Sequence, residues 1–429
     1  MKTVKVSILG FGTVGAGVAR ILLENGEVIA KRIGVKLELT RIADLDITTS
    51  RGITIPPGIL TTSVDEAINE ADIVVELIGG TTVAKTFILK ALNAGKHVVT
   101  ANKALLATYG EELFAAAQAN AVDLYYEASV AGGIPVIKAL REGLAANHIK
   151  GIYGIMNGTC NYILTRMEQE GADFEPILKD AQKLGYAEAE PSLDIDGFDT
   201  AHKTAILGAL AYGEWFGIDE VYVEGIRNVS QIDLKFADEL GYRIKLLAII
   251  KEVDGNVQLR VHPTLIPKTT MLANISGVFN GVAIDGDMVG RTLFYGRGAG
   301  REATASAVVA DICDVALNLA KNCVGRVPAF REGKQFCGRT SMDDIVMRYY
   351  LRLLVTDQPG VLAEITSILA RHGISISSVV QHETNAADGV ELLILTHQVM
   401  ERSIKAAIAE IESLSVVCDK VKLFRIEDI

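Results

Sequence analysis

Cysteine is scarce in this chain of 429 residues, which holds five at scattered positions and no Cys-x-x-Cys pair. Disulfide frameworks and structural zinc sites need such pairs, so we expect neither, and reduced thiols suit the cytoplasm. The first residues enter an apolar strand at once and leave no room for a signal peptide. No uninterrupted apolar run approaches the roughly 20 residues that cross a bilayer. We therefore expect a cytoplasmic protein with no membrane partner.

An excess of positive charge is also missing, because the formal net charge is −11 and is spread along the chain. A diffuse acidic surface argues against nucleic acid as a partner. Aromatic residues make up only 6%, whereas 49% of the residues are hydrophobic, which fits compact α/β domains. The length exceeds that of one ordinary core, so we expect two or three domains.

Short apolar strands alternate with helices over the first 135 residues. Strands are expected at 4–9, 37–42, 73–78, 97–100 and 124–127, and helices up to about residue 23, at 82–94 and at 111–119. This alternation predicts a doubly wound parallel sheet of the Rossmann type, the dinucleotide-binding domain. A glycine-rich segment at 296–300 opens a further helix to about residue 320, and residues 297–320 are expected to complete this domain.

The rest of the chain predicts two more units and a connection. Residues 136–296 read as an α+β domain for catalysis and dimerisation, with strands at 245–252 and 257–262 around a hairpin turn and helices near 199–215 and 230–240. The polar, glycine-containing stretch 321–347 is typical of a linker. Residues 348–429 show the β-α-β-β-α-β order of a ferredoxin-like domain.

A glycine turn of the form G-x-G-x-x-G follows the first strand and opens a helix, through Gly10, Gly12, Thr13, Val14 and Gly15. Its glycines permit a tight turn, close approach to a pyrophosphate and helix-to-strand packing, so the motif favours a dinucleotide. Asp44, after the second strand, fits either a hydrogen bond to the adenine ribose, which favours NAD, or a turn. Arg41 and Arg51, by contrast, fit ion pairs with the 2′-phosphate of NADP. The choice of NAD or NADP therefore stays open.

Two lysines are candidates for proton transfer to or from a substrate oxygen. Lys103 follows the strand that ends at Thr100, at the edge where ligands bind to open parallel sheets. Asp199 and Lys203 lie four apart and share one helix face. Taken alone, each of these features also fits a surface lysine or an ordinary ion pair. Carboxylates just upstream, Glu188 and Asp194 among them, suit an ammonium-bearing substrate.

Cys160 and three histidines read as structural. Cys160 has no histidine nearby in the sequence to activate it as a nucleophile, so we expect a small packed thiol. His148, His202 and His262 lack metal-ligand spacing.

With these motifs assembled, the whole chain closely resembles the homoserine dehydrogenases that carry a C-terminal ACT domain. The segments that carry the resemblance are 10–15, 76–80, 100–103, 127–135, 157–164, 185–188 and 194–203, and those in the middle are the most specific. Members of that family interconvert L-aspartate 4-semialdehyde and L-homoserine with NADPH or NADH, on the route to threonine, methionine and isoleucine. The resemblance implies the same reaction here.

The resemblance also implies roles for individual residues. Lys203 and Lys103 are implied as the catalytic pair, oriented with the substrate by Asp199, and which lysine is the acid stays open. Glu188, Asp194, Asn157, Gly158 and Thr159 are implied to bind substrate beside the nicotinamide, and Thr100, Lys103 and Gly298 join the glycine turn and Asp44 in binding the cofactor. Backbone carbonyls around Glu127, Val130, Gly132 and Ile134 are implied as a sodium site.

The C-terminal unit resembles an ACT domain through residues 356–362 and 372–376. Such domains pair with one another and bind amino acids at the strand-to-helix turn, which implies feedback inhibition by L-threonine and a homodimer or homotetramer. The effector residues implied are Asp357, Gly360, Val361, Leu362 and Ile374. The alternative is a dimerisation module that has lost its ligand.

The chain departs from the family in two places. Where relatives often read Gly-Pro-Gly-Ala-Gly-Gly-x-Pro, this chain has Arg297, Arg301 and Ala303, and the two arginines lie near the expected cofactor cleft. Ala43 replaces a larger or basic residue beside the acid. Two rival functions stay open at this point: an enzyme like aspartate-semialdehyde dehydrogenase, which needs an activated cysteine, and an amino-acid sensor that keeps a nucleotide fold without catalysis.

Overall fold

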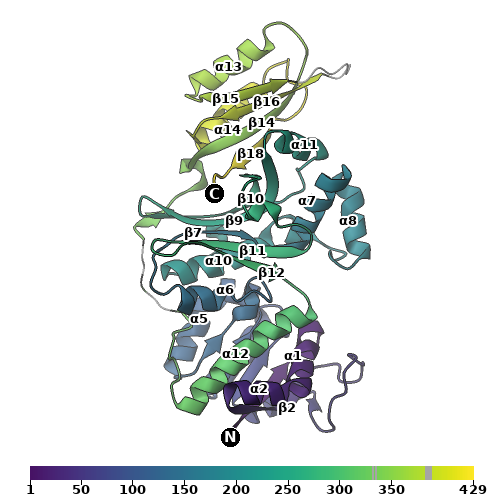
Figure 1. Cartoon of the computed structure of the whole chain (residues 1–429), viewed down its shortest axis with the longest axis vertical. Coiled ribbons are helices and arrows are strands. Elements are labelled where there is room, and N and C mark those ends of the chain that lie inside the picture. Colours follow the sequence, from purple (N-terminus) through teal and green to yellow (C-terminus); the bar gives the residue numbers. More distant parts are fainter. Residues whose placement is uncertain (331–332, 334–335, 382–388) are drawn as a thin grey trace.

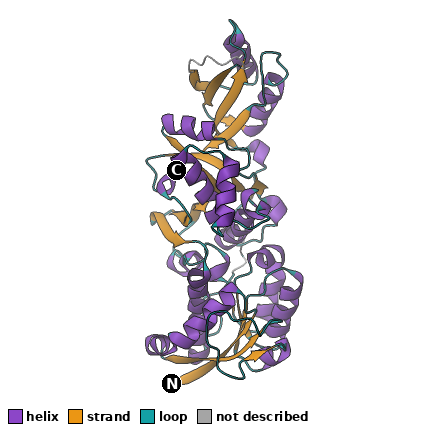
Figure 2. Ribbon diagram, turned by 90° about the vertical axis from the view of Figure 1, so that its right-hand side faces the viewer, coloured by secondary structure: helices purple, strands orange, loops and turns teal. Residues whose placement is uncertain are grey.

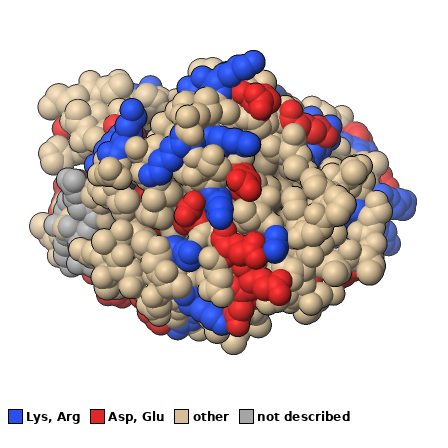
Figure 3. Space-filling model, turned by 90° about the horizontal axis from the view of Figure 1, so that it is seen from below, with Lys and Arg blue, Asp and Glu red and all other residues tan. Residues whose placement is uncertain are grey.

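The computed structural model describes residues 1–330, 333, 336–381 and 389–429. The molecule is elongated, with three regions stacked along its long axis (Figures 1 and 2). The N-terminus lies at one end, and the chain reaches the opposite end in its last hundred residues. The C-terminus then returns to the side of the middle region (Figure 1). Basic and acidic side chains are interspersed on the face at the N-terminal end (Figure 3).

The first region is a parallel sheet with helices on both faces, as predicted. Its strands are β1 (Lys2–Leu9), β2 (Val35–Ala43), β3 (Leu60–Thr61), β4 (Ile73–Glu76), β5 (His97–Thr100) and β6 (Leu124–Tyr125), in the order β3-β2-β1-β4-β5-β6. Every neighbouring pair is parallel. This order reverses direction between β1 and β4, and ligands bind at such a point.

Side chains that alternate along each strand pack into two different cores, one on each face of the sheet. On β4, Ile73 and Val75 pack towards α1 (Thr13–Glu24) and α12 (Arg301–Lys321), whereas Val74 packs with the opposite helices. The other helices of this region are α2 (Gly26–Ile33), α3 (Val64–Asn69), α4 (Thr82–Asn93) and α5 (Lys103–Ala119).

Helix α5 begins eight residues earlier than the sequence predicted. Asn102 caps it, because its side-chain oxygen accepts the N–H of Leu105 at 3.1 Å. Lys103 is therefore the first residue of a helix rather than a loop residue. The strand expected at 124–127 also ends early and turns into a short 3₁₀ helix, η1 (Glu127–Ser129).

Helix α12 is long and apolar enough, by length and composition alone, to span a membrane. Charged residues interrupt this helix, so it contains no uninterrupted apolar run of that length. Half of its apolar window is buried in this structure, where it packs along α1 and contacts β2 and β5. We interpret it as a core helix of the first region (Figure 1).

The middle region is built on a mostly antiparallel sheet, and its helix at 198–212 packs between this sheet and α5 of the first region. Its strands are β7 (Ile149–Ile155), β8 (Tyr222–Val223), β9 (Tyr242–Val253), β10 (Asn256–Pro267), β11 (Phe279–Gly286) and β12 (Gly290–Arg297). Its helical elements are α6 (Val136–Lys138), η2 (Ala139–Gly143), α7 (Gly158–Glu170), α8 (Phe174–Lys183), α9 (Ser192–Ile195), α10 (Phe198–Tyr212), η3 (Ile218–Glu220), α11 (Gln231–Glu239) and η4 (Leu272–Asn274).

The hairpin predicted at Asp254-Gly255 is confirmed. Both residues have positive φ, 51° and 77°, as a type I′ hairpin turn requires, and β9 and β10 pair antiparallel along their length. The helices α7 and α8 and the strands β7, β11 and β12 are not among the elements predicted from the sequence.

The C-terminal region has the predicted ferredoxin-like order. Its elements are η5 (Met342–Asp344), β14 (Val346–Val355), α13 (Val361–Arg371), β15 (Ile376–Gln381), β16 (Val390–Thr396), β17 (Val399–Met400), α14 (Glu401–Ile411) and β18 (Lys422–Ile426). Strand β18 pairs antiparallel with β14 and parallel with β10 of the middle region. One sheet, ordered β12-β11-β7-β9-β10-β18-β14-β16-β15, therefore runs through both regions.

The segment predicted as a linker, 321–347, lies in part outside the described residues, at 331–332 and 334–335. Two parts of this segment pack on the rest of the molecule. Phe336 stacks on Phe216 with ring centroids 5.6 Å apart, and β13 (Gly338–Arg339) pairs with β10.

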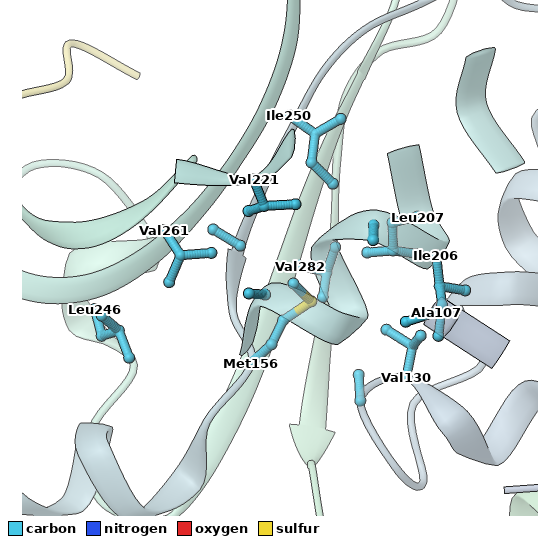
Figure 4. Close-up of a cluster of buried hydrophobic side chains, with 14 of the residues drawn as sticks. Ala107, Val130, Met156, Ile206, Leu207, Val221, Leu246, Ile250, Val261 and Val282 are labelled. Atoms are coloured by element: carbon cyan, nitrogen blue, oxygen red, sulfur yellow. The ribbon is translucent and has the colours of Figure 1, made fainter. Parts of the chain in front are cut away.

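The main core joins the first and middle regions. Figure 4 shows Met156, which follows β7, beside Val282 of β11. Ile206 and Leu207 of α10 lie towards Ala107 of α5. Helix α10 is thus held from both sides, which fixes the position of the charged residues at its first turns.

Candidate active site

A cavity of about 640 Å³ lies between the first and middle regions, at the end of the parallel sheet where its strands finish. Residues far apart in the sequence line it: Thr13, Val14, Lys103, Gly132, Asn157, Gly158, Thr159, Gly185, Tyr186, Glu188, Asp194, Asp199, Lys203, Arg297, Gly298 and Arg301 among them. The structure thus brings both lysines, all five predicted substrate residues and part of the glycine turn to one cleft.

The Asp199 carboxylate is the centre of the polar residues in this cleft. Its Oδ2 accepts the Lys203 Nζ at 2.7 Å, and its Oδ1 lies 3.1 Å from the Lys103 Nζ. The Lys203 ammonium also donates to the backbone oxygen of Met156 at 2.7 Å. Asp199 and Lys203 are buried, whereas the Lys103 side chain is 34% exposed. One carboxylate therefore holds two ammonium groups side by side.

Local structure explains why these groups meet. Asp199 and Lys203 occupy successive turns of α10, so the i,i+4 spacing places them on one face. Lys103 begins α5, directly after the end of β5. The Met156 carbonyl follows the end of β7, and no sequence motif identified it, because any residue supplies the same backbone oxygen.

Asp194 fixes the polar residues at the start of α7. Its Oδ1 accepts the Asn157 Nδ2 at 2.7 Å, and its Oδ2 accepts the Thr159 hydroxyl at 3.2 Å. Asn157 donates to Asp199 as well, at 2.9 Å, and its own oxygen caps α7 by accepting the N–H of Cys160. Both oxygens of Asp194 are thus occupied by the protein.

Burial and neighbouring charge act differently on the two buried acids. Burial opposes the ionisation of Asp199, but Lys203 and Lys103 overcome it and hold its pKa below the ordinary range. Burial raises the pKa of Asp194, and repulsion from Asp199 adds to the rise. Asp199 is consequently a fixed anion that keeps both lysines in place.

Glu188 stands apart from this hydrogen-bonded set. It is exposed at the rim of the cavity, and its carboxylate has no hydrogen bond or ion pair with any described residue. Only its backbone oxygen is used, by Gln182. The carboxylate is therefore open to a cationic group of a ligand.

The glycine turn fits a dinucleotide phosphate. A Cβ atom at Gly10 would lie 2.6 Å from the Leu77 oxygen, and one at Gly15 would lie 2.0 Å from the Gly10 oxygen, so neither position admits a side chain. A Cβ at Gly12 would meet nothing within 4 Å, which leaves open space beside the start of α1. No side chain caps α1, so its first N–H groups face that space with the positive end of the helix dipole.

Two predicted cofactor residues have other partners. Asp44 accepts the backbone N–H groups of Phe11, at 2.5 Å, and of Asp46, at 2.9 Å, which is the arrangement of a turn residue. The Thr100 hydroxyl donates to Glu76 at 2.7 Å and is fully buried. Neither residue lines the cleft, and Arg41 pairs with Glu70 instead.

The loop around Val130 fits the donor set of a hard cation. Ala131 and Gly132 both have positive φ, 54° and 53°, so the loop folds back on itself. Among the described residues, nothing donates a hydrogen bond to the carbonyl oxygens of Val130 and Gly132, although both residues are buried. The Ile134 oxygen already accepts the N–H of Val136. Oxygen ligands of this kind suit sodium or calcium.

Glu127 differs from Asp199 because its neighbours do not compensate for burial. Its carboxylate accepts the N–H groups of Ile137 and Lys138, at 2.8 Å and 2.7 Å. Burial nevertheless raises the pKa of Glu127 to about 7. No cluster of three or more His, Cys, Asp or Glu side chains with metal-binding geometry occurs in the part of the chain that the structure describes.

Cys160 and the histidines occupy structural positions. The Cys160 thiol is fully buried and lies 3.2 Å from the Asp194 backbone oxygen, and burial raises its pKa well above the ordinary value. A thiol in this state is a poor nucleophile. Burial lowers the pKa of His202 and His262, so both are neutral at pH 7. The His148 backbone N–H pairs with Asp287.

The predicted effector residues of the C-terminal region are only partly together. Gly360 and Val361 line a cavity of about 670 Å³ between α13 and α14, with Arg371 and Glu410 at one side. Asp357 and Leu362 are exposed and Ile374 is buried, and none of these three lines the cavity.

Comparison with known proteins decides the family. The family model described as homoserine dehydrogenase matches residues 135–313, its NAD-binding domain matches 10–127, and the ACT domain matches 349–416. Over their full lengths, the chain is 46% identical to a homoserine dehydrogenase of Neisseria gonorrhoeae, across 434 aligned residues. The chain belongs to the homoserine dehydrogenase family.

Solved structures agree with this assignment. A homoserine dehydrogenase from Thiobacillus denitrificans superposes with a TM-score of 0.94 at 47% identity, covering 100% of this chain and 99% of that one. A hyperthermophilic archaeal homoserine dehydrogenase in complex with NADPH covers 74% of this chain and 98% of its own, with a TM-score of 0.62 and 29% identity. The predicted fold, with a Rossmann-type sheet, a catalytic domain and an ACT domain, is confirmed.

Proposed function

We propose that this chain interconverts L-homoserine and L-aspartate 4-semialdehyde with NAD or NADP, in the cytoplasm, on the route to threonine, methionine and isoleucine. The observation that carries the proposal is the pair of ammonium groups, of Lys103 and Lys203, held on the buried Asp199 inside the cleft. The glycine turn borders the same cleft, so cofactor and substrate would meet there.

Lys203 handles the proton in this proposal. Its ammonium has three N–H donors, of which two are used on Met156 and Asp199. The third is left for the substrate oxygen in the cavity. A nicotinamide cofactor held by the glycine turn would supply the hydride chemistry at the carbon that bears this oxygen. In the reducing direction Lys203 protonates the oxygen as negative charge develops on it, and in the oxidising direction the neutral amine accepts the hydroxyl proton.

Lys103 supports this step electrostatically. Its ammonium shares the Asp199 carboxylate with Lys203 and is partly exposed, so it stabilises negative charge near the same oxygen and remains in contact with water. Asp199 positions both lysines.

The remaining cleft residues bind the amino acid part of the substrate and the cofactor. Glu188 holds the substrate ammonium with its unpaired carboxylate. Asp194 acts through Asn157 and Thr159, with Gly158 between them at the start of α7. Gly10, Gly12, Thr13, Val14, Gly15 and Gly298 hold the dinucleotide, with Asp44 and Thr100 behind them. The orphan carbonyls of Val130 and Gly132, with Glu127 and Ile134 beside them, bind a sodium ion.

Regulation belongs to the same proposal. The ACT domain binds L-threonine at the turn of Gly360, Val361, Asp357 and Leu362, with Ile374 below it, and threonine inhibits the enzyme in a homodimer or homotetramer. The domain limits proposed are 1–135 with 297–320, 136–296, a linker at 321–347 and 348–429.

The test is to follow nicotinamide absorbance with L-homoserine, offering NAD and NADP separately, with and without L-threonine. The proposal expects homoserine-dependent reduction of at least one cofactor, and a lower rate with threonine. Absence of turnover with both cofactors, while the protein still binds threonine and a dinucleotide, would instead make it an amino-acid sensor.

A further inference from the structure

A second, smaller cavity of about 260 Å³ lies beside the start of α1. Gly12, Thr13 and Ala16 line it from the glycine turn and the first turn of α1, and Arg51 and Arg301 line it from elsewhere. Thr13 and Arg301 also line the large cleft, so the two cavities adjoin at these residues. A ligand that enters the cleft over the glycine turn can extend into the smaller cavity.

Arg51 is fixed against the glycine turn. Its Nε donates to the Phe11 backbone oxygen at 2.9 Å, and its Nη2 donates to Asp46 at 3.1 Å. The side chain is only 25% exposed. The guanidinium is therefore held at the phosphate-binding turn before any ligand arrives, which lowers the entropy cost of using it.

Arg301 approaches the same cavity from the far end of the sequence. It is the first residue of α12, and its Nη2 donates to the Arg51 backbone oxygen at 2.8 Å. A Cβ added at Gly17 would lie 2.9 Å from the Arg301 oxygen, so the start of α12 packs tightly on α1. The Arg301 Nε is buried and has no hydrogen-bond partner, and no described carboxylate pairs with this guanidinium.

The cavity therefore carries more positive charge than its neighbours neutralise. Two guanidinium groups meet there with one carboxylate, that of Asp46, and the uncapped start of α1 adds its own partial positive charge. Leaving a buried Nε without an acceptor costs free energy, and so does bringing two like charges together. An anion with several oxygen acceptors would offset both costs.

We propose that Arg301, together with Arg51, binds a phosphate group of the dinucleotide in this cavity, and that Arg301 is a cofactor-positioning residue. The inference rests on the dinucleotide binding proposed above. Guanidinium groups bind phosphate oxygens through paired N–H donors, and the two arginines present such donors from two walls of one cavity. The group is either the pyrophosphate, which NAD and NADP share, or the 2′-phosphate, which only NADP carries.

The test measures dissociation constants of NAD and NADP for the wild type and for Arg301→Met, which keeps the aliphatic stem and removes the charge. Arg20→Met is the matched control, because Arg20 lies on the exposed side of α1, pairs with Glu24 and lines neither cavity. Loss of a charge-assisted contact is expected to weaken binding by about tenfold or more. Arg51→Met is expected to act in the same direction, and Arg20→Met to leave both constants unchanged.

Which of the two cofactors binds more weakly to the variant identifies the phosphate group that the cavity holds. Weakening of NADP alone assigns the cavity to the 2′-phosphate and makes Arg301 a determinant of cofactor choice. Equal weakening of both cofactors assigns it to the pyrophosphate. Unchanged binding of both cofactors by Arg301→Met, with a normal wild type, overturns this inference alone. A wild type that binds neither cofactor overturns the proposed function itself.

Discussion

Two clusters of buried charge in this molecule differ in how completely their cations are paired. In the cleft, Lys103 and Lys203 share a single carboxylate, that of Asp199, and both line a cavity. At the junction with the ACT domain, Arg352 alone pairs with two acids, Asp233 at 2.6 Å and Glu391 at 3.0 Å.

The second arginine of the junction is also paired with two acids. Arg425 of β18 lies 2.6 Å from Glu401 and 2.6 Å from Glu224. Hydrogen bonds within the protein use four of the five guanidinium N–H donors of Arg352 and four of those of Arg425, and neither side chain lines a cavity described above. These pairs join the ACT domain to the middle region. The comparison indicates that spare hydrogen-bonding capacity facing a cavity marks a reactive centre, whereas saturated buried charge holds domains together.

The largest effect is expected from Asp199→Asn in the cleft. The neutral amide no longer compensates the two ammonium groups, which then repel each other and leave their positions. We expect kcat/KM for L-homoserine to fall by about 10² to 10⁴. Steady-state rates measure this, with Asp233→Asn as the matched control that removes a buried carboxylate outside the cleft. If both variants lose the same activity, the two clusters do not differ in function.

The free energy of unfolding should instead respond to substitution of Asp233 at the junction. Asp233→Asn leaves the buried Arg352 guanidinium without its best partner and is expected to lower the free energy of unfolding by about 3 to 5 kcal/mol. The double variant Asp233→Asn with Arg352→Met should recover part of that loss, because no unpaired charge remains. Denaturant titration measures both. If Asp233→Asn is as stable as the wild type, the pair of Asp233 and Arg352 does not stabilise the junction.

A pH titration contrasts Asp199 with Glu127. Lysines hold the pKa of Asp199 below its ordinary value of 3.8, so the stability it contributes is present above that pH and is lost as the pH falls towards its folded pKa. Burial raises the pKa of Glu127 from 4.5 to about 7, so the folded protein keeps a proton that the unfolded chain releases, and stability falls as the pH rises through that window.

Glu127→Gln removes the second titration. In sodium-free buffer, the free energy of unfolding of the variant relative to that of the wild type should rise by about 3 kcal/mol from pH 4 to pH 8. Denaturant midpoints across this range provide the measurement. A constant difference between variant and wild type would mean that Glu127 is ionised throughout.

The smallest effect is expected from Cys160→Ala. The thiol is buried against the Asp194 backbone, and its raised pKa removes it from chemistry, so only packing is lost. We expect a stability loss of about 1 kcal/mol and turnover close to that of the wild type. Abolished turnover in a folded variant would favour the rival reaction, in which a cysteine forms a thioester.

The sequence predicted the parts of the fold that depend on local pattern. Short apolar strands alternating with helices, together with the glycine turn, identified the parallel sheet, and the ferredoxin-like order was predicted for the C-terminal unit. Helix α7 was missed because it begins with Gly158 and Thr159, residues of low helix propensity, and the cap by Asn157 appears only in the folded chain. The parallel pairing of β18 with β10 joins residues some 160 positions apart and has no local signal.

The candidate site was predictable in its residue types but not in its geometry. The i,i+4 spacing of Asp199 and Lys203 placed them together correctly. Nothing local indicated that Lys103 reaches the same carboxylate or that the Met156 carbonyl accepts Lys203, because tertiary packing of α5, α10 and β7 creates both contacts. Arg301 was noticed only as a departure, and its place beside Arg51 comes from the packing of α12 on α1.

The most direct test of the account is a single-turnover measurement of cofactor reduction by L-homoserine with Lys203→Met, alongside the dissociation constant of the cofactor. Met keeps the length of the side chain and removes the proton-carrying group, while Asp199 keeps Lys103 as its partner. The account predicts a rate about 10² to 10⁴ lower, with cofactor binding within a factor of about three. A rate within about threefold of the wild type would contradict the role of Lys203 and with it the distinction between the two clusters.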